Sequence, residues 1–112
     1  MTQPALVQAV EGLKEAFLKR RHKDLPRANE VWASLADKGP ALAADTTLGD
    51  AIPRDRWPRP FRNHANLNRL ELAHAHRALY TVYYDAALDQ HKVVIEWIGS
   101  HKEYDVLFGY TG

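Results

Sequence analysis

The sequence predicts a single α+β domain in which an N-terminal helical hairpin packs on one face of a C-terminal antiparallel β-sheet. Helical periodicity with clear start and stop signals occupies residues 1–40. Segments rich in β-branched and aromatic residues, joined by short polar links, follow from residue 66. A chain of 112 residues has the usual size of one domain, so residues 1–112 are expected to share one core.

The first predicted helix begins at Leu6. Its apolar residues recur every three to four positions, which is the spacing of a single helical face. They are Leu6, Val10, Leu13 and Phe17. The pattern ends in the polar run KRRHKD at residues 19–24. This segment is expected to form the first arm of the hairpin.

The second predicted helix has a defined start and end. Asp24 is a plausible N-cap, and Pro26 falls in the first turn, where its missing N–H costs little. The apolar stripe comprises Ala28, Val31, Trp32 and Leu35. Gly39 followed by Pro40 is a strong stop signal. The hairpin is therefore expected to end at residue 40.

Residues 41–65 are predicted to form a basic, proline-rich loop. Three prolines in the piece IPRDRWPRPFRNH remove backbone donors and force extended backbone before them, which excludes a regular helix. Trp57 and Phe61 are expected to anchor the loop on the core. An aromatic side chain among arginines can instead stack on a nucleic-acid base, and this alternative stays open.

Positive charge is concentrated between Arg54 and Arg77, although the net charge of the chain is only +1. The arginines of this segment are Arg54, Arg56, Arg59, Arg62, Arg69 and Arg77. The same segment contains only two acidic residues, Asp55 and Glu71. Such local density is expected for contact with phosphate groups, and a solvated arginine-rich loop is the equally open alternative.

Three strands are predicted for residues 66–112, in the segments LNRLELAH, HRALYTVYYD and HKVVIEWIG. Their short links favour an antiparallel meander. If residues 85–91 close a hairpin, Tyr84 lies opposite about Lys92, and Arg77 opposite about Gly99. The preceding turn places Glu71 near Arg77. We therefore expect Arg77 and the GSHKEY turn that follows the last strand to meet at one end of the sheet.

Together with the helical hairpin, the segments GDAIPRDRWPRPF, NLNRLELAHAHRALYTV and VVIEWIGSHKEYDVLFGY resemble the RelE/ParE superfamily of bacterial and archaeal toxins. The resemblance covers most of the chain after Leu6. It implies a toxin of a type II toxin–antitoxin module, covered by a cognate antitoxin. The RelE branch cleaves mRNA in the ribosomal A site without a metal or other cofactor. The ParE branch inhibits DNA gyrase and lacks the nuclease residues.

The resemblance also implies roles for particular residues. Arg77 matches the strand arginine that contacts the scissile phosphate, and Lys102 falls near a second basic catalytic residue. Phe108 falls near a catalytic tyrosine but has no hydroxyl, so Tyr104 or Tyr110 would fill that role. The strand that opens the fold in this family is expected to be short or missing here, because helical periodicity starts by Leu6.

Metal-free RNA cleavage requires a proton acceptor for the 2′-OH, charge stabilisation at phosphorus and a proton donor for the 5′-oxygen. In the functional interpretation Arg77 and Lys102 hold the phosphate, and His101 or Tyr104 transfers protons. The loop and strand arginines that would bind RNA are Arg54, Arg56, Arg59, Arg62 and Arg69.

A structural role remains open for each of these side chains. Arg77 can pair with Glu71 across the strands, and His101 can cap the strand end through a backbone hydrogen bond. Tyr104 and Phe108 can pack on the core. His74 and His76, at i and i+2, would share a strand face, but no third ligand is evident, so no metal site is expected.

Ribosome-dependent mRNA cleavage is the favoured activity. The alternatives are a non-enzymatic gyrase inhibitor of the same fold and an inactive member that only binds its antitoxin. The expected partners are the antitoxin, with a heterotetramer as one assembly, and the ribosome with its mRNA. The chain has no secretory signal and no apolar run near the roughly 20 residues of a membrane span, so a cytoplasmic location without membrane contact is expected.

Overall fold

The computed structural model describes residues 3–110. In chain order the elements are β1 (Leu6–Ala9), α1 (Leu13–Arg20), α2 (Leu25–Asp37), α3 (Gly39–Ala44), β2 (Asp50–Ala51), β3 (Asn68–Leu72), β4 (His76–Asp85), β5 (Gln90–Ser100) and α4 (His101–Phe108). Short 3-10 turns occupy His22–Asp24, Arg54–Arg56 and Arg59–Phe61. None of the described helices is long and apolar enough to cross a membrane.

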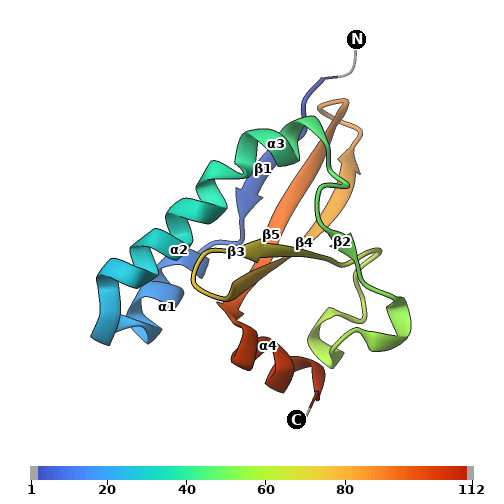
Figure 1. Ribbon diagram of the computed structural model, residues 1–112. Helices are drawn as coiled ribbons and strands as arrows, with labels where there is room; N and C mark the ends of the chain where they lie inside the picture. Colours follow the sequence, from blue (N-terminus) through green and yellow to red (C-terminus); the bar gives the residue numbers. More distant parts are fainter. Residues whose placement is uncertain (1–2, 111–112) are drawn as a thin grey trace.

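One five-stranded sheet organises the fold, with the strand order β1-β5-β4-β3-β2. Strands β3, β4 and β5 form the predicted antiparallel meander, β2 joins it antiparallel, and β1 lies parallel to β5. Helices α1, α2 and α3 lie along one side of this sheet, whereas α4 leaves the end of β5 beside the loop that connects β2 to β3 (Figure 1). The predicted α+β class is confirmed.

The register of the meander agrees closely with the prediction. Arg77 lies opposite Gly99 and opposite Glu71 on its other side, as expected. Tyr84 lies opposite His91, one residue from the predicted partner. The register shifts by one between Leu79 and Tyr80, which is why the two ends of the same hairpin differ by one position.

The prediction that the first helix begins at Leu6 is wrong, because Leu6–Ala9 is strand β1. Leu6 is exposed whereas Val7 and Ala9 pack against the core, which is the alternation of a strand. Gly12 then takes a positive φ of 81° immediately before α1. The opening strand, expected to be short or missing, is therefore present as a short strand of four residues at one edge of the sheet.

Two further boundaries differ from the prediction. Helix α2 has the expected N-cap, with Asp24 accepting from the backbone N–H of Arg27, but Gly39 and Pro40 begin a new helix instead of a loop. Pro40 is tolerated there because the first turn of a helix needs no N–H donor. The predicted hairpin of residues 1–40 thus becomes a strand followed by three helices that end at Ala44.

The GSHKEY segment was predicted as a turn, but it contains the end of β5 and the first turn of α4. Ser100 accepts a hydrogen bond from the backbone N–H of Glu103, and the Glu103 carboxylate accepts from the backbone N–H of Ser100. This reciprocal capping box starts the helix at His101. The spacing of Ser100 and Glu103 was the local signal for it.

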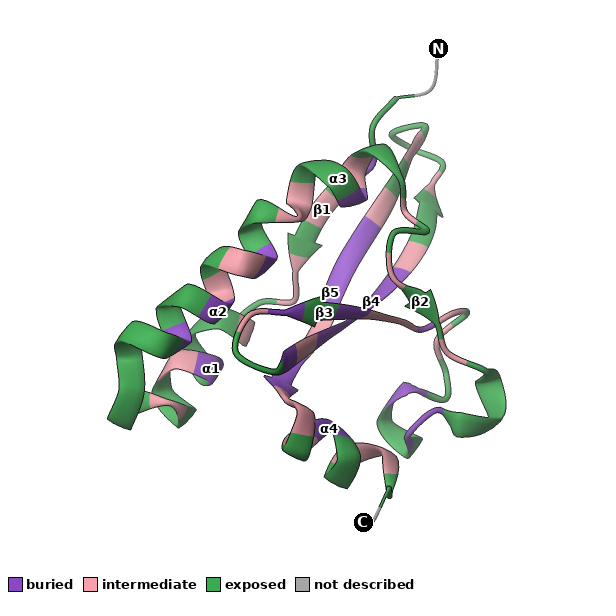
Figure 2. Cartoon of the chain, in the orientation of Figure 1, coloured by how far each residue is buried: buried purple, intermediate pink, exposed green. Residues whose placement is uncertain are grey.

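Apolar side chains are buried in two clusters, one on each face of the sheet. Figure 2 marks which residues along the chain are buried. The main core lies under the helices and includes Phe17, Val31, Leu35, Leu42, Tyr80, Val93, Ile95 and Ile98. The second core, which we call the loop core, lies on the other face and comprises Trp57, Phe61, Leu67, Leu79 and Tyr104. The expectation that Trp57 and Phe61 anchor the basic loop is confirmed. The loop core also fixes α4 against the sheet.

Candidate phosphate-binding site at one end of the sheet

Side chains from three elements meet where β4 begins and β5 ends. Arg77 comes from β4, Glu71 from the facing position of β3, and His101 and Tyr104 from the first turn of α4. The backbone N–H of His101 donates to the carbonyl of Ala75, at 2.8 Å, which holds the start of α4 against the β3–β4 turn. The register and the capping box together bring these residues to one place.

Glu71 is the centre of this cluster. Its Oε1 accepts from Nε of Arg77 at 2.7 Å, and its Oε2 lies 2.9 Å from Nε2 of His101. Arg69 Nε lies 3.9 Å from Oε1. Partial burial acts to raise the pKa of Glu71, but the hydrogen bonds from His101 and Arg77 outweigh it and leave the pKa below its usual range. The carboxylate is therefore ionised at neutral pH and orients the side chains of both Arg77 and His101.

Tyr104 forms the floor of the site. Its ring is almost fully buried, and the guanidinium carbon of Arg77 lies 4.6 Å from the ring centroid. Burial raises the pKa of Tyr104, and the neighbouring Arg69 opposes this only in part. The hydroxyl is therefore protonated at neutral pH. Tyr104 lines a small cavity of about 120 Å³ together with Arg56, Arg69 and Tyr110, so it is reached from solvent through that cavity.

The other predicted site residues are distributed differently. Lys102 is exposed, and no hydrogen bond or ion pair connects it with another side chain within residues 3–110. Phe108 stacks on Tyr104 with 4.2 Å between ring centroids and packs on the loop core, which confirms its structural role. The alternative that His101 caps the strand end by a backbone hydrogen bond agrees with the structure, since its backbone N–H donates to the carbonyl of Ala75, while its ring contacts Glu71.

The candidate RNA-binding arginines divide into two groups. Arg69 belongs to the site itself, between Asp50 and Glu71. Arg54 stacks over Trp57, with 4.6 Å between its guanidinium carbon and the ring centroid, and donates to the carbonyl of His64. The remaining three, Arg56, Arg59 and Arg62, are exposed and form no ion pair within the described part of the chain.

The two histidines that were expected to share a strand face do not do so. His74 lies in the β3–β4 turn with a positive φ of 55° and contacts Glu30, whereas His76 is buried at the start of β4. The ring of His76 donates from Nδ1 to the carbonyl of His74. Among residues 3–110 there is no group of three His, Cys, Asp or Glu side chains placed to hold a metal ion.

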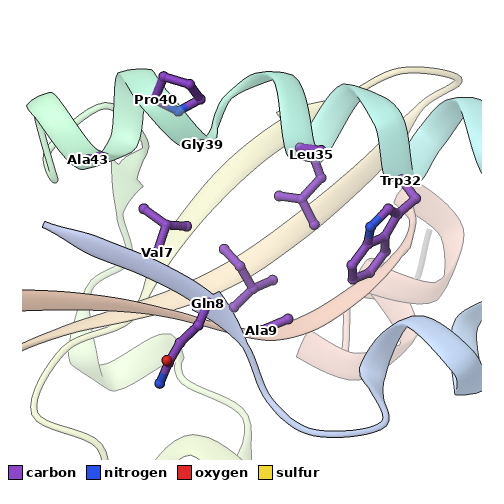
Figure 3. A pocket seen from close by; sticks show the side chains of 10 residues that line it. Val7, Gln8, Ala9, Trp32, Leu35, Gly39, Pro40 and Ala43 are labelled. Carbon is purple, nitrogen blue, oxygen red and sulfur yellow. The ribbon is translucent and has the colours of Figure 1, made fainter.

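A separate apolar groove lies between β1 and the helices α2 and α3. Its volume is about 380 Å³, and Val7, Ala9, Trp32, Leu35 and Ala43 are among its lining residues. Figure 3 shows Trp32 and Leu35 pointing from α2 toward β1. Val10 donates its N–H to the carbonyl of Ile95 in β5. Because the backbone N–H and C=O groups of successive strand residues point alternately to the two sides, those of Val7 and Ala9 point away from β5, along the free edge of the sheet.

Sequence reasoning missed the central position of Glu71 and the joint contribution of Arg56 and Tyr110 to the cavity beside Tyr104. Glu71 was considered only as a pairing partner of Arg77, whereas it also holds His101.

No model of a known protein family matches the chain, and no curated protein sequence matches it. The resemblance to RelE/ParE toxins therefore depends on the motifs alone.

Proposed function

We propose that this chain is the toxin of a type II toxin–antitoxin module and cleaves mRNA on the ribosome without a metal ion. The observation that supports this best is that Arg77 and His101 both contact the carboxylate of Glu71, with Arg77 also lying over the Tyr104 ring. A phosphate-binding cation, a histidine and a protonated tyrosine can supply the charge stabilisation, the proton acceptor and the proton donor that metal-free phosphodiester cleavage requires. The motif resemblance points to the same chemistry.

Each residue then has a defined role. The terminal nitrogens of Arg77 bind the scissile phosphate, since only its Nε is bonded to Glu71. Donation from Nε2 of His101 to Glu71 leaves Nδ1 as the acceptor for the 2′-OH proton. The new bond between the 2′-oxygen and phosphorus displaces the 5′-oxygen, which takes the proton of Tyr104. The products are a 2′,3′-cyclic phosphate and a 5′-OH. Exposed Lys102 contributes positive charge near the RNA.

The partners follow from this activity. The ribosome and its mRNA are the target, which places the action in the cytoplasm. The cognate antitoxin is proposed to cover the groove lined by Val7, Trp32 and Ala43, where the free edge of β1 offers backbone groups beside an apolar surface. A toxin–antitoxin heterotetramer is the proposed resting assembly.

Induced expression in a bacterial host tests the function. Protein synthesis should stop before replication does, and transcripts should be cut within translated regions. Blocking translation initiation should abolish the cuts, because the ribosome is required. Rapid double-strand breaks in DNA with intact mRNA would instead identify a gyrase inhibitor. An antitoxin complex without either effect would identify an inactive member of the family.

A further inference from the structure

The β3–β4 turn, residues 73–75, has a backbone conformation that its sequence does not favour. His74 and Ala75 take positive φ values of 55° and 53°. Hairpin turns that need such values normally place Gly, Asn or Asp there. The Ala75 methyl group lies too close to the backbone in this region and has no polar atom that could compensate. The turn is therefore strained, and contacts with its surroundings must hold it in place.

Helix α2 supplies two of these contacts, and in Figure 1 the turn lies beside this helix. The Ser34 hydroxyl accepts from the backbone N–H of Ala73 at 3.1 Å and donates its own proton within α2. The Glu30 carboxylate contacts Nε2 of His74. Within the turn, Nδ1 of His76 donates to the carbonyl of His74. Ser34 is half buried whereas Glu30 is exposed, so water competes less with the hydrogen bond to Ser34.

The other side of the turn holds α4. The carbonyl of Ala75 accepts from the backbone N–H of His101 at 2.8 Å. His101 is the first residue of α4, where a backbone N–H has no partner within the helix. The capping box satisfies the N–H groups of Ser100 and Glu103 and leaves that of His101 to the turn. The orientation of the Ala75 carbonyl therefore decides where α4 begins, and with it the place of the His101 ring beside Glu71.

We propose that Ser34 and Ala75 are positioning residues for His101. Ser34 holds the strained turn, and the Ala75 carbonyl fixes the start of α4 so that the His101 ring meets Glu71. In an unstrained turn, loss of the Ser34 hydroxyl would remove one hydrogen bond and leave the backbone where it is. In a strained turn, the same loss lets the Ala75 peptide relax away from His101. The importance of this for cleavage rests on the proposed function; the positioning does not.

Hydrogen exchange of the His101 amide, followed by NMR, tests the positioning without any substrate. Ser34→Ala should make this amide exchange about tenfold faster relative to the amides of β4, a factor typical of one lost hydrogen bond. The ring signals of His101 should shift as well, because the ring leaves the Glu71 carboxylate. Ser34→Thr keeps the hydroxyl and should retain the exchange rate and the ring signals of the native chain.

Ala75→Gly distinguishes a strained turn from an unstrained one, because glycine adopts a positive φ without steric cost. Alone, this substitution should raise the melting temperature, since the strain removed exceeds the entropy added to the unfolded chain. Combined with Ser34→Ala, it should restore most of the protection of the His101 amide. A hydrogen bond that acted independently of the strain would lose the same protection in both backgrounds.

Asp24→Ala is the matched control for a general weakening of α2. Its carboxylate accepts from the backbone N–H of Arg27 at the start of the helix and does not contact the turn. This variant should lower the melting temperature but leave the exchange of the His101 amide, relative to β4, and the His101 ring signals unchanged. If Ser34 acted only through the stability of α2, Asp24→Ala and Ser34→Ala would affect His101 alike.

The positioning role is wrong if Ser34→Ala leaves the His101 amide protected, or if Ala75→Gly restores no protection in the double variant. Under the proposed function, Ser34→Ala should lower kcat for cleavage with little change in KM, because Arg77 keeps its place on β4. An unchanged kcat would exclude a role of the turn in cleavage. A native chain that cuts no transcripts would overturn the proposed function instead, and the exchange measurements would still decide the positioning.

Discussion

At the scale of single residues, Glu71 decides how the candidate site is organised. One carboxylate holds the Nε of Arg77 and the Nε2 of His101, and it fixes the orientation of both side chains before any substrate arrives. The same contact is the cross-strand ion pair expected for a purely structural arginine. The geometry is therefore compatible with two roles for Arg77, binding of the scissile phosphate and a purely structural pair with Glu71. Comparing the cleavage activity of Arg77 variants with their thermal stability distinguishes the two.

Substitution of Arg77 makes this comparison. If Arg77 stabilises charge that develops on the scissile phosphate, Arg77→Ala should lower the rate of transcript cleavage by about 10²-fold. Arg77→Lys should recover only part of the rate, because an ammonium lacks the planar fork. The melting temperature should change little, since the partner carboxylate is half exposed and such pairs contribute about 1 kcal/mol or less. Cleavage assays and thermal unfolding of the same preparations measure the rate of transcript cleavage and the melting temperature.

Glu71→Gln is the matched control for the Arg77 variants, because it removes the carboxylate charge but retains the shape and the arginine. Full cleavage activity in Arg77→Ala would remove Arg77 from the site. An inactive Arg77→Ala protein that also melts many degrees lower would show that Arg77 is structural.

His76 predicts a pH dependence of stability. Burial lowers its pKa below the ordinary value of 6.5, and Arg21 adds to this, while the carbonyl of His74 and the carboxylate of Glu103 act in the opposite direction. The ring donates from Nδ1, and its Nε2 is buried without a hydrogen-bond partner. Protonation would therefore place a charged N–H where no acceptor lies.

Because the folded pKa of His76 is lowered, the unfolded chain binds the proton first. The contribution of His76 to stability is present above pH of about 6.5 and is lost as the pH falls below that value toward its folded pKa. The melting temperature of the native chain should fall between pH 6.5 and pH 5, and His76→Gln should flatten this slope whatever its own melting temperature. An equal slope in both proteins would exclude His76 as the cause.

At the scale of elements, α4 carries the site because its start is fixed from two sides. Ser100 and Glu103 cap it, and Glu103 also pairs with Arg20, at 3.2 Å, and with Arg21 at the end of α1. At its other end Gly109 takes a positive φ of 74° and ends the helix. His101 and Tyr104, one turn apart, are thereby held toward the sheet.

Ser100→Ala should therefore loosen the first turn of α4. Loss of an N-cap side chain costs about 1 kcal/mol, which corresponds to a fall of about 4 °C in melting temperature for a domain of this size. Cleavage should fall as well, because His101 follows the cap directly. Ser100→Thr keeps the hydroxyl and should retain both the melting temperature and the cleavage activity of the native chain. Hydrogen exchange of the α4 amides locates the change, and unaltered exchange in Ser100→Ala would contradict the role of the cap.

At the scale of the whole molecule, the fold separates two surfaces. The candidate site lies at one end of the meander, where β4 begins and β5 ends, and the apolar groove lies at the β1 edge beside α2 and α3. A partner bound in the groove would cover the free sheet edge without touching Arg77, so under the proposed function an antitoxin there would act by occluding the ribosome-binding surface.

Substitution in the groove tests this arrangement. Ala36 lines the groove, whereas Ala33, also exposed and on the same helix, does not. Ala36→Glu should weaken the complex with the product of the adjacent gene, because it places a charge in an apolar interface, and Ala33→Glu should leave it intact. Co-purification followed by size-exclusion chromatography measures both. Equal binding by both variants would show that the antitoxin occupies another surface.

The sequence alone determined the features that depend on neighbouring residues along the chain. The position of Arg77 opposite Glu71 and Gly99 follows from short links and strand alternation, which fix a hairpin register locally. The start of α2 immediately after Asp24 follows from this N-cap, which lies three residues before Arg27. Burial of Trp57 and Phe61 follows from the size of their apolar rings, which are costly to leave exposed in a polar loop.

Only the tertiary structure decided the rest. The spacing of Leu6 and Val10 fits a helix or a strand, and pairing beside β5 selects the strand because it supplies hydrogen bonds that an isolated turn of helix lacks. The meeting of Arg56 with Tyr110 depends on the loop core, where Trp57 and Tyr104 pack together from distant parts of the chain. Burial of apolar surface is non-directional and can join residues that are far apart in the sequence. The local sequence therefore carries no pattern that identifies which residues will pack together.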